Sequence, residues 1–164
     1  MATDDPAVRV LFVCTGNTCR SPLAAAALAA ELGGDAGRVQ IGSAGTAALD
    51  GQPVSEGTRV VAESDGIDLS GHRSRRITPA LLRAADFVFV MEPLHRVAVE
   101  ALGAPRDRVH LLSEWPEPGE PDLPISDPFG ASKESYEECW RRIRRHIGRV
   151  APLVRKALQA RKAS

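Results

Sequence analysis

Residues 8–13 read Val-Arg-Val-Leu-Phe-Val and run directly into Cys-Thr-Gly-Asn-Thr-Cys-Arg-Ser-Pro at residues 14–22. The first stretch is rich in β-branched side chains and almost continuously apolar, which is typical of a strand buried on both faces of a parallel sheet. Ser21 is the expected N-cap and Pro22 the first residue of a helix that continues to Leu32. The sequence therefore predicts a strand, a loop and a helix in direct succession.

The alternation of strands and helices continues along the chain. Apolar segments typical of strands lie at 39–43, 87–91 and 109–112. Helical patterns lie at 55–64, from 78–79 onward, at 93–102 and at 133–160. We therefore expect an α/β fold with one domain over residues 1–164. Its three-layer sandwich would have helices on both faces of a four-stranded, mostly parallel sheet, with the functional loop after strand 1.

The last helical segment carries one apolar stripe and many arginines. Cys139 belongs to the stripe and is expected in the core. Pro152 falls inside the segment, where it either kinks the helix or ends it. The arginines are expected to form a solvated outer face without an assigned function; they are Arg141, Arg142, Arg144, Arg145 and Arg149.

A proline-rich segment precedes that helix. It contains five prolines, which are Pro116, Pro118, Pro121, Pro124 and Pro128. Because proline continues neither a helix nor a strand ladder, residues 113–129 are expected to form a long surface loop. Trp115 in this loop either anchors it to the body of the protein or supplies a stacking wall near a site.

The composition argues against several functional classes. The 164 residues include 21 Lys and Arg and 21 Asp and Glu, so the bulk charge gives no reason to expect nucleic acid or an anionic membrane as a partner. The sequence shows neither a secretion signal nor an apolar run long enough to span a membrane. Three cysteines without paired spacing suit a reducing compartment. We therefore expect a cytoplasmic, monomeric protein that binds neither nucleic acid nor membranes.

The loop at 14–22 has the residues needed to bind an anion next to a nucleophile. A loop that opens a helix directs backbone N–H groups and the positive end of the helix dipole at an anion, and Gly16 permits its tight curvature. Arg20 adds a planar fork of donors that binds two phosphate oxygens at once. The same positive field favours the thiolate of Cys14, to which Ser21 can donate a hydrogen bond. Each residue alone has an ordinary structural explanation, but their joint order predicts a loop that handles phosphate.

The chain resembles the low-molecular-weight protein phosphatases, whose signature Cys-x-x-x-x-x-Arg-Ser/Thr it matches from Cys14 to Ser21. The resemblance covers nearly the whole chain, because further stretches follow in the family's order: Ser43-Ala44-Gly45, Gly71-His72-Arg73, residues 86–91 and Asp127-Pro128-Phe129. It implies that phosphorylated proteins are the substrates and that Cys14 attacks phosphorus to form a phosphocysteine. Neither a metal nor a cofactor is expected, since fixed donors hold the charge.

The resemblance also assigns roles to individual residues. Arg20 would bind the phosphate, and Ser21 would support the thiolate. The remaining phosphate- and substrate-binding residues would be Thr15, Gly16, Asn17, Thr18 and Cys19. Asn17, Ser43 and His72 would brace the loop from behind, which for His72 differs little from an ordinary structural histidine.

Asp127 is the candidate general acid. The leaving group must be protonated, and the water that later attacks the intermediate needs a base, so one carboxyl group can serve both steps. Asp127-Pro128 alone is at least as typical of a turn. The resemblance supplies the catalytic assignment, because the family carries an Asp-Pro-aromatic sequence at this place as its general acid.

Thr18 is the residue that bears on which phosphorylated amino acid is the substrate. Tyrosine-directed members of the resembled family commonly have an apolar residue here, often isoleucine, whereas threonine resembles the bacterial protein-arginine phosphatases. A smaller wall with a hydroxyl group suits a guanidinium better than a phenyl ring. The stretch Thr46-Ala47-Ala48-Leu49 lacks the aromatic residue that some tyrosine-specific relatives place at the rim of the pocket, and Phe129 stands where they often have tyrosine. We therefore favour phosphoarginine, with phosphotyrosine as the alternative.

Three further interpretations remain open from the sequence. The resemblance supports a disulfide between Cys14 and Cys19 that protects the nucleophile from over-oxidation, although Cys19 could equally be a small packing residue. A thioredoxin-coupled arsenate reductase would need a downstream cysteine pair, and Cys139 is the only later cysteine. A module that only binds phosphorylated partners would need neither Cys14 nor Asp127.

Overall fold

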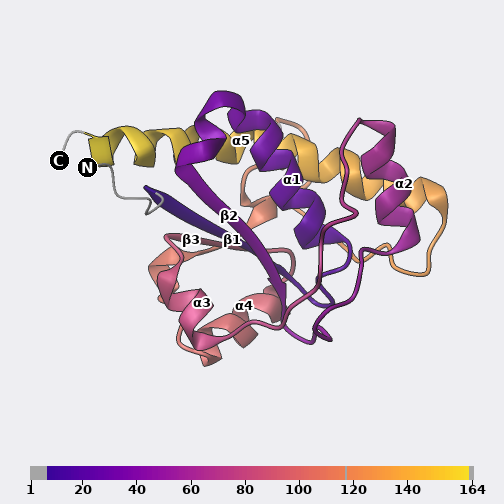
Figure 1. Ribbon diagram of the computed structural model, residues 1–164, viewed down its shortest axis with the longest axis horizontal. Coiled ribbons are helices and arrows are strands. Elements are labelled where there is room, and N and C mark those ends of the chain that lie inside the picture. Colours follow the sequence, from indigo (N-terminus) through magenta and orange to yellow (C-terminus); the bar gives the residue numbers. More distant parts are fainter. Residues whose placement is uncertain (1–6, 117, 163–164) are drawn as a thin grey trace.

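Four parallel strands form the centre of the computed structural model, which describes residues 7–116 and 118–162 (Figure 1). Their order across the sheet is β2–β1–β3–β4, and all three pairings are parallel. The strands are β1 (Val8–Cys14), β2 (Val39–Gly45), β3 (Phe87–Val90) and β4 (Val109–Leu111). The predicted α/β fold is confirmed. The expected domain over residues 1–164 includes residues 1–6, 117 and 163–164, which lie outside the described residues.

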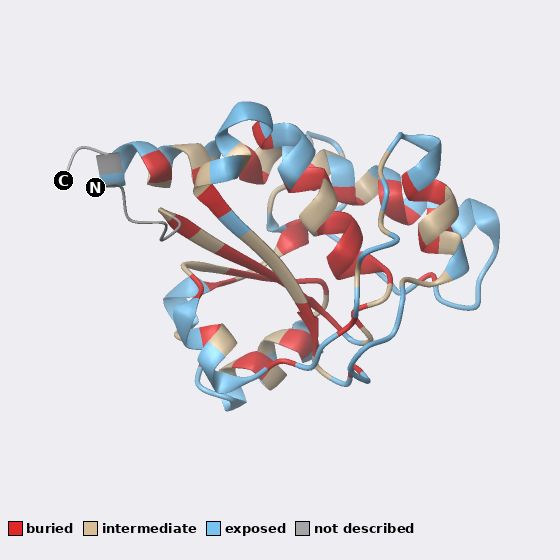
Figure 2. Ribbon diagram, viewed as in Figure 1, coloured by how far each residue is buried: buried red, intermediate tan, exposed pale blue. Residues whose placement is uncertain are grey.

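Helices cover both faces of the sheet and bury its side chains (Figures 1 and 2). Val10 and Phe12 of β1 contribute to the cluster beneath α1 (Arg20–Leu32) and α5 (Lys133–Lys162). Leu11 and Val13, which point the other way, contribute to the cluster that includes α3 (Pro79–Ala84) and α4 (Pro93–Ala101). The continuous apolar run of β1 is therefore explained by burial on both faces.

Shorter elements complete the chain. Helix α2 (Glu56–Ser64) packs beside α5, and three 3₁₀ turns connect other elements: η1 (Gly33–Arg38), η2 (Arg106–Arg108) and η3 (Leu112–Glu114). From Trp115 to Ser132, the described residues form no helix or strand, as the prolines predict. Among the helices of residues 7–116 and 118–162, none is both long and apolar enough to cross a membrane.

Two details differ from the sequence-based expectation, and the structure decides a third, the course of α5 at Pro152, which the sequence left open. Helix α1 begins at Arg20 with Cys19 as its N-cap, so the prediction that Ser21 caps the helix is wrong. The reason is that the Ser21 hydroxyl is bonded to Cys14 and Asn17 instead. Helix α5 continues through Pro152 to its end. The arginines of α5 do not all face solvent, because the side chain of Arg142 is only 16% exposed.

The strand order places the candidate site. From β1 the chain continues to β2 on one side of the sheet, and from β3 it continues to β4 on the other side. The side on which the next strand is added therefore changes between β1 and β3, although all four strands are parallel. In open α/β sheets, a crevice forms at this point outside the carboxyl ends of the strands. The loop after Cys14 and the turn after Val90 both lie there.

Candidate active site

The loop after β1 is held by the end of β2. The N–H groups of Thr46 and Ala47 donate to the carbonyls of Cys14 and Thr15, at 2.9 and 3.0 Å. A Cβ atom on Gly45 would lie 2.4 Å from the Thr15 carbonyl oxygen, so only glycine lets the two backbones approach this closely. The loop is thus fixed from its outer side before any ligand binds.

Asn17 is the internal support of the loop. Its φ of 57° lies in the left-handed region, which asparagine tolerates better than most residues. Its amide nitrogen donates to the hydroxyls of Ser21 and Ser43 at 2.8 and 2.9 Å, and its side-chain oxygen accepts from the N–H of Arg75 at 2.9 Å. Its carbonyl lies 2.7 Å from His72 Nε2. Burial is the main cause that lowers the pKa of His72, so a neutral ring donates this hydrogen bond.

Cys14 ends β1 with its sulfur close to a hydroxyl. Sγ lies 3.0 Å from Ser21 Oγ, and the Cys14 side chain is buried apart from its edge on the cavity described below. Because Asn17 donates to Ser21 Oγ, the single proton of Ser21 has two acceptors within reach, the sulfur at 3.0 Å and the Ala44 carbonyl at 3.4 Å, and the sulfur is the nearer. This arrangement suits a thiolate, which is an acceptor only.

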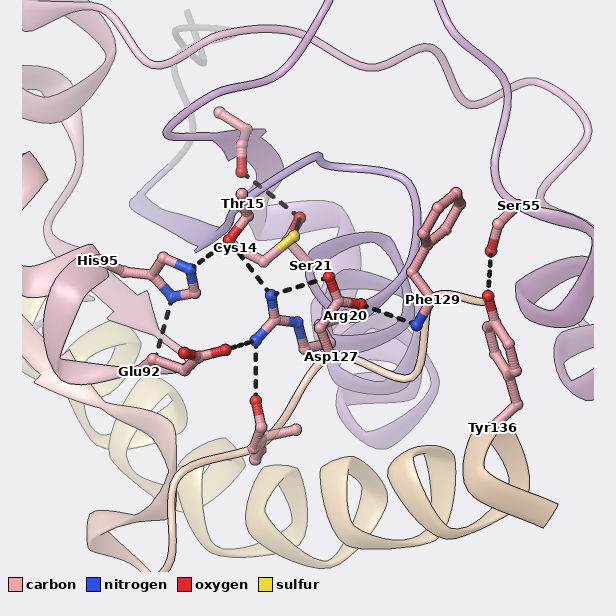
Figure 3. Close-up of polar contacts among 12 residues, drawn as sticks. Cys14, Thr15, Arg20, Ser21, Ser55, Glu92, His95, Asp127, Phe129 and Tyr136 are labelled. Carbon is pink, nitrogen blue, oxygen red and sulfur yellow. Dashed lines mark hydrogen bonds and ion pairs between the residues drawn. The ribbon is translucent and has the colours of Figure 1, made fainter. Parts of the chain in front are cut away.

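Arg20 begins α1 and is buried, with 1% of its surface exposed. Its Nη1 pairs with the Glu92 carboxylate and donates to the carbonyl of Ile125 at 2.9 Å. Its Nη2 is directed to the other side, 3.4 Å from Thr15 Oγ1 and 3.6 Å from the nearer oxygen of Asp127 (Figure 3). The guanidinium is therefore clamped along one edge while its other edge faces the cavity.

His95 connects the loop to the turn after β3. Its Nδ1 accepts from the backbone N–H of Glu92 at 3.1 Å, and its Nε2 lies 2.8 Å from Thr15 Oγ1 (Figure 3). Burial first, and then the charge of Arg20, lower the pKa of His95 from 6.5 to about 4. The ring is therefore neutral near pH 7, and because Nδ1 accepts, Nε2 carries the proton and donates to Thr15.

Asp127 approaches from the proline-rich loop. Its Oδ1 accepts from the backbone N–H of Phe129 at 3.0 Å, which orients the carboxylate, and its side chain is 44% exposed. Pro128 is buried, whereas the ring of Phe129 is exposed at the rim. The Asp127 carboxylate therefore lies opposite the loop of Cys14 and remains accessible to a ligand.

These side chains enclose a cavity of about 190 Å³. Its lining consists of Cys14, Thr15, Gly16, Thr18, Cys19, Arg20, Asp127 and Phe129. The other residues expected in the site, which are Asn17, Ser21, Ser43 and His72, lie behind the loop and contact it as described above. Cys14 and Cys19 are both free thiols.

Trp115 lies on the core side of its loop. Its ring meets those of Phe89 and His110 edge-on, at 5.8 and 5.5 Å between centroids, and it does not line the cavity. Its carbonyl is 3.0 Å from His146 Nδ1. Trp115 is thus a loop anchor, and the alternative that it forms a stacking wall of the site is wrong.

The sequence interpretation missed Glu92 and His95. Glu92 is the N-cap of α4, and the side chains of Glu92 and His95 form its capping box. The signal was available in Glu92-Pro93-x-His95 directly after a predicted buried strand, which is where side chains enter the crevice of a parallel sheet. What the sequence did not show is that this strand is the neighbour of β1.

Comparison with known proteins agrees with this geometry. The model of the family "Low molecular weight phosphotyrosine protein phosphatase" matches residues 9–163. The chain belongs to this family. A probable low molecular weight protein-tyrosine-phosphatase, EpsP of Ralstonia nicotianae, is 33% identical over 89% of this chain and 95% of its own. A protein-arginine-phosphatase of Geobacillus stearothermophilus is 35% identical over 87% of this chain and 93% of its own.

A solved structure of the family shares the fold. It is a serine-for-cysteine mutant of the YwlE arginine phosphatase with a phosphorylated active-site serine, and it superposes with a TM-score of 0.81 at 28% identity, covering 91% of this chain and 97% of the other. Relatives named for tyrosine and for arginine thus both resemble this chain. The chain is a low-molecular-weight, cysteine-based protein phosphatase, and its substrates are phosphorylated proteins.

Proposed function

We propose that this phosphatase acts on phosphoarginine in proteins, with Cys14 as nucleophile, Arg20 as phosphate clamp and Asp127 as general acid and base. One observation carries the assignment of roles: these three residues line a single cavity, with the Asp127 carboxylate 3.6 Å from the Arg20 guanidinium. Because Asp127 lies this close to Arg20, its carboxylate would be next to a phosphoryl group bound by the same arginine. A mere binding site for phosphate would gain nothing from an added negative charge.

The reaction follows from the positions of these groups. The Cys14 thiolate attacks phosphorus, the P–N bond to the substrate guanidine breaks, and Asp127 gives its proton to the departing nitrogen. Arg20 and the loop N–H groups hold the equatorial oxygens during the transfer. Water then attacks the phosphocysteine while the Asp127 carboxylate takes its proton. Inorganic phosphate leaves, and Cys14 returns as a thiolate stabilised by Ser21.

The walls of the cavity support phosphoarginine. Thr18 lines both the cavity and an adjoining hollow of about 370 Å³, which Ala47 and Leu49 also line. The guanidinium of phosphoarginine is planar, but it carries N–H groups that a phenyl ring lacks, so it needs hydrogen-bonding partners in the wall, and the Thr18 hydroxyl is one such group. Among the residues that the structure describes, Phe129, which is exposed at the rim, is the only aromatic one lining either hollow.

Phosphotyrosine is the second candidate. Phe129 could stack on a phenyl ring, and EpsP, which is 33% identical, is named for tyrosine. Against this, Trp115 does not reach the cavity, so Phe129 would have no aromatic partner on an opposite wall. The choice between the substrates therefore depends mainly on Thr18.

The test is the ratio of kcat/KM for a phosphoarginine peptide to that for a phosphotyrosine peptide of the same sequence. We expect the wild type to favour phosphoarginine and Thr18→Ile to shift the ratio towards phosphotyrosine by roughly ten- to a hundredfold. Thr18→Val, which keeps the volume and removes the hydroxyl, separates the two causes: an equal shift identifies the hydroxyl, and a small one identifies the size of the wall. A wild type that prefers phosphotyrosine, or a ratio unchanged in Thr18→Ile, would refute the arginine assignment.

A further inference from the structure

Four arginines in the first half of α5 divide into two groups. Arg141 and Arg144 are more than half exposed and pair with Glu138 and Asp65 on the surface. Arg142 and Arg145 turn instead toward the proline-rich loop. Both reach the Glu120 carboxylate, with Nε of Arg142 at 3.7 Å and Nη2 of Arg145 at 3.1 Å. The group formed by Glu120, Arg142 and Arg145 is called the loop clasp below.

Arg142 makes the closest contacts of the loop clasp. Its Nη2 donates to the carbonyl of Leu123 at 2.6 Å, and its Nη1 donates to the carbonyl of Pro124 at 3.1 Å. These carbonyls belong to a segment without helix or strand, where no backbone N–H of a described regular element bonds to them. The guanidinium supplies the hydrogen-bond donors that a neighbouring strand or helical turn would otherwise provide. Its side chain is 16% exposed and that of Glu120 is 12% exposed, so water screens these interactions only partly.

The next residue brings the chain into the site. Ile125 is buried, its N–H donates to the Met91 carbonyl at 3.1 Å, and its carbonyl accepts from Arg20 Nη1 at 2.9 Å. Asp127 follows two residues later. Past Asp127, a turn in which Ala131 N–H donates to the Pro128 carbonyl leads into α5 at Lys133. The segment that carries Asp127 is therefore tied to α5 at both ends, by the chain itself on one side and by Arg142 on the other.

Between these ends the segment is not packed on the helix. A hollow of about 390 Å³ separates the two, with Asp127 and Pro128 on the loop side and Ser135, Cys139 and Arg142 on the helix side. Because side chains do not fill this space, α5 gives Asp127 itself little packing support. The carboxylate is placed instead by contacts on either side of it, which are those of the buried Ile125 and Pro128 and the bonds from Arg142 to the preceding carbonyls.

We propose that Arg142 is a positioning residue for Asp127: by holding the carbonyls of Leu123 and Pro124, it sets where the carboxylate stands relative to the bound phosphoryl group. The inference rests on the proposed role of Asp127 as general acid. Displacement of a catalytic group by about 1 Å can cost up to about a hundredfold in rate. Loss of the Arg142 contacts should therefore slow those reactions that need the acid and spare those that do not.

The experiment compares Arg142→Met, which keeps the apolar stem and removes the donors, with Arg141→Met as the control on the same helix. Each variant is assayed with aryl phosphates of graded leaving-group basicity. The readout is kcat/KM, which reports the steps up to departure of the leaving group and leaves out the later hydrolysis, in which Asp127 is the base. We expect Arg142→Met to lose about tenfold in kcat/KM with phenyl phosphate and less than about twofold with 4-nitrophenyl phosphate, whose leaving group needs little protonation. Arg142→Lys should lose less than Arg142→Met. Inhibition by inorganic phosphate, which reports the Cys14 loop, should not change.

A double variant connects the effect to the acid. In the background of Asp127→Ala, the Arg142→Met exchange should cost nothing further, because the group that it positions is absent. An equal loss of kcat/KM with every leaving group, a full additional loss of kcat/KM in the double variant, or behaviour like that of Arg141→Met would overturn the positioning role. If Asp127→Ala itself shows no dependence on the leaving group, the proposed function fails, whatever Arg142 does.

Discussion

His95 should make the protein lose stability in acid, and His95→Asn should remove that loss. The imidazole is 3% exposed and held between the Glu92 N–H and the Thr15 hydroxyl. Burial and the charge of Arg20 lower its pKa to about 4, whereas in the unfolded chain it takes up a proton near 6.5. Between these values the unfolded state binds the additional proton. Stability therefore falls as the pH falls through this window.

The magnitude follows from the two pKa values. The difference corresponds to at most about 3 kcal/mol, because each unit contributes about 1.4 kcal/mol. Solvent screening reduces the effect, so we expect about 2 kcal/mol between pH 7.5 and pH 4.5. A proton on Nδ1 would also face the Glu92 N–H, so the hydrogen bond between them would be lost. His95 would then no longer link the turn after β3 to Thr15.

Urea denaturation at half-unit steps of pH measures this directly. The free energy of unfolding of the wild type should fall by about 2 kcal/mol more than that of His95→Asn over the window. His110→Asn is the matched control: burial also lowers the pKa of His110, but its ring is only partly buried, so this exchange should leave most of the acid loss in place. Parallel curves for the wild type and His95→Asn would refute the reasoning.

Two further predictions concern the Cys14 loop. Gly45→Ala should destabilise the protein by about 1–3 kcal/mol and weaken inhibition by phosphate, because the added Cβ would lie 2.4 Å from the Thr15 carbonyl oxygen. Gly148→Ala is the control: its added Cβ has no atom within 4 Å, so it should stabilise α5 by up to about 1 kcal/mol in the same urea titration. Peroxide should inactivate the enzyme by oxidising Cys14 to a sulfenic acid, which then condenses with the Cys19 thiol to a disulfide and water. A thiol should therefore restore the activity of the wild type and restore much less of the activity of Cys19→Ala. The step should be slow near pH 7, since hydrogen bonding with Cys139 and burial raise the pKa of the Cys19 thiol; equal recovery of the two proteins would exclude the disulfide.

The sequence predicted the sheet and the loop because both depend on contiguous residues. A short, nearly continuous apolar run rich in β-branched residues is typical of a strand covered on both faces, and Cys14 and Ser21 lie at the two ends of one short loop. The strand limits differ from the structure by no more than two residues. The one clear error at this place, the cap at Ser21, arose because a helix N-cap and a partner for sulfur use the same hydroxyl chemistry.

The parts that were missed depend on which elements become neighbours. Glu92 reaches Arg20 because β3 lies beside β1, which periodicity does not reveal. Arg142 could not be separated from the other arginines of its run, since only the path of the proline-rich loop brings Leu123 and Pro124 to it. In both cases the single residue looked ordinary, and its partner lay far away in the chain.

The most direct test of the proposed chemistry is to detect the covalent intermediate. Enzyme mixed with excess phosphoarginine peptide would be quenched within the first turnover, digested and analysed by mass spectrometry, with Cys14→Ser as the control for the attacking atom. We predict one phosphoryl group on the peptide that contains Cys14, present during turnover and lost when the substrate is consumed. Turnover without a phosphorylated Cys14, or a phosphoryl group carried by another residue, would contradict the account.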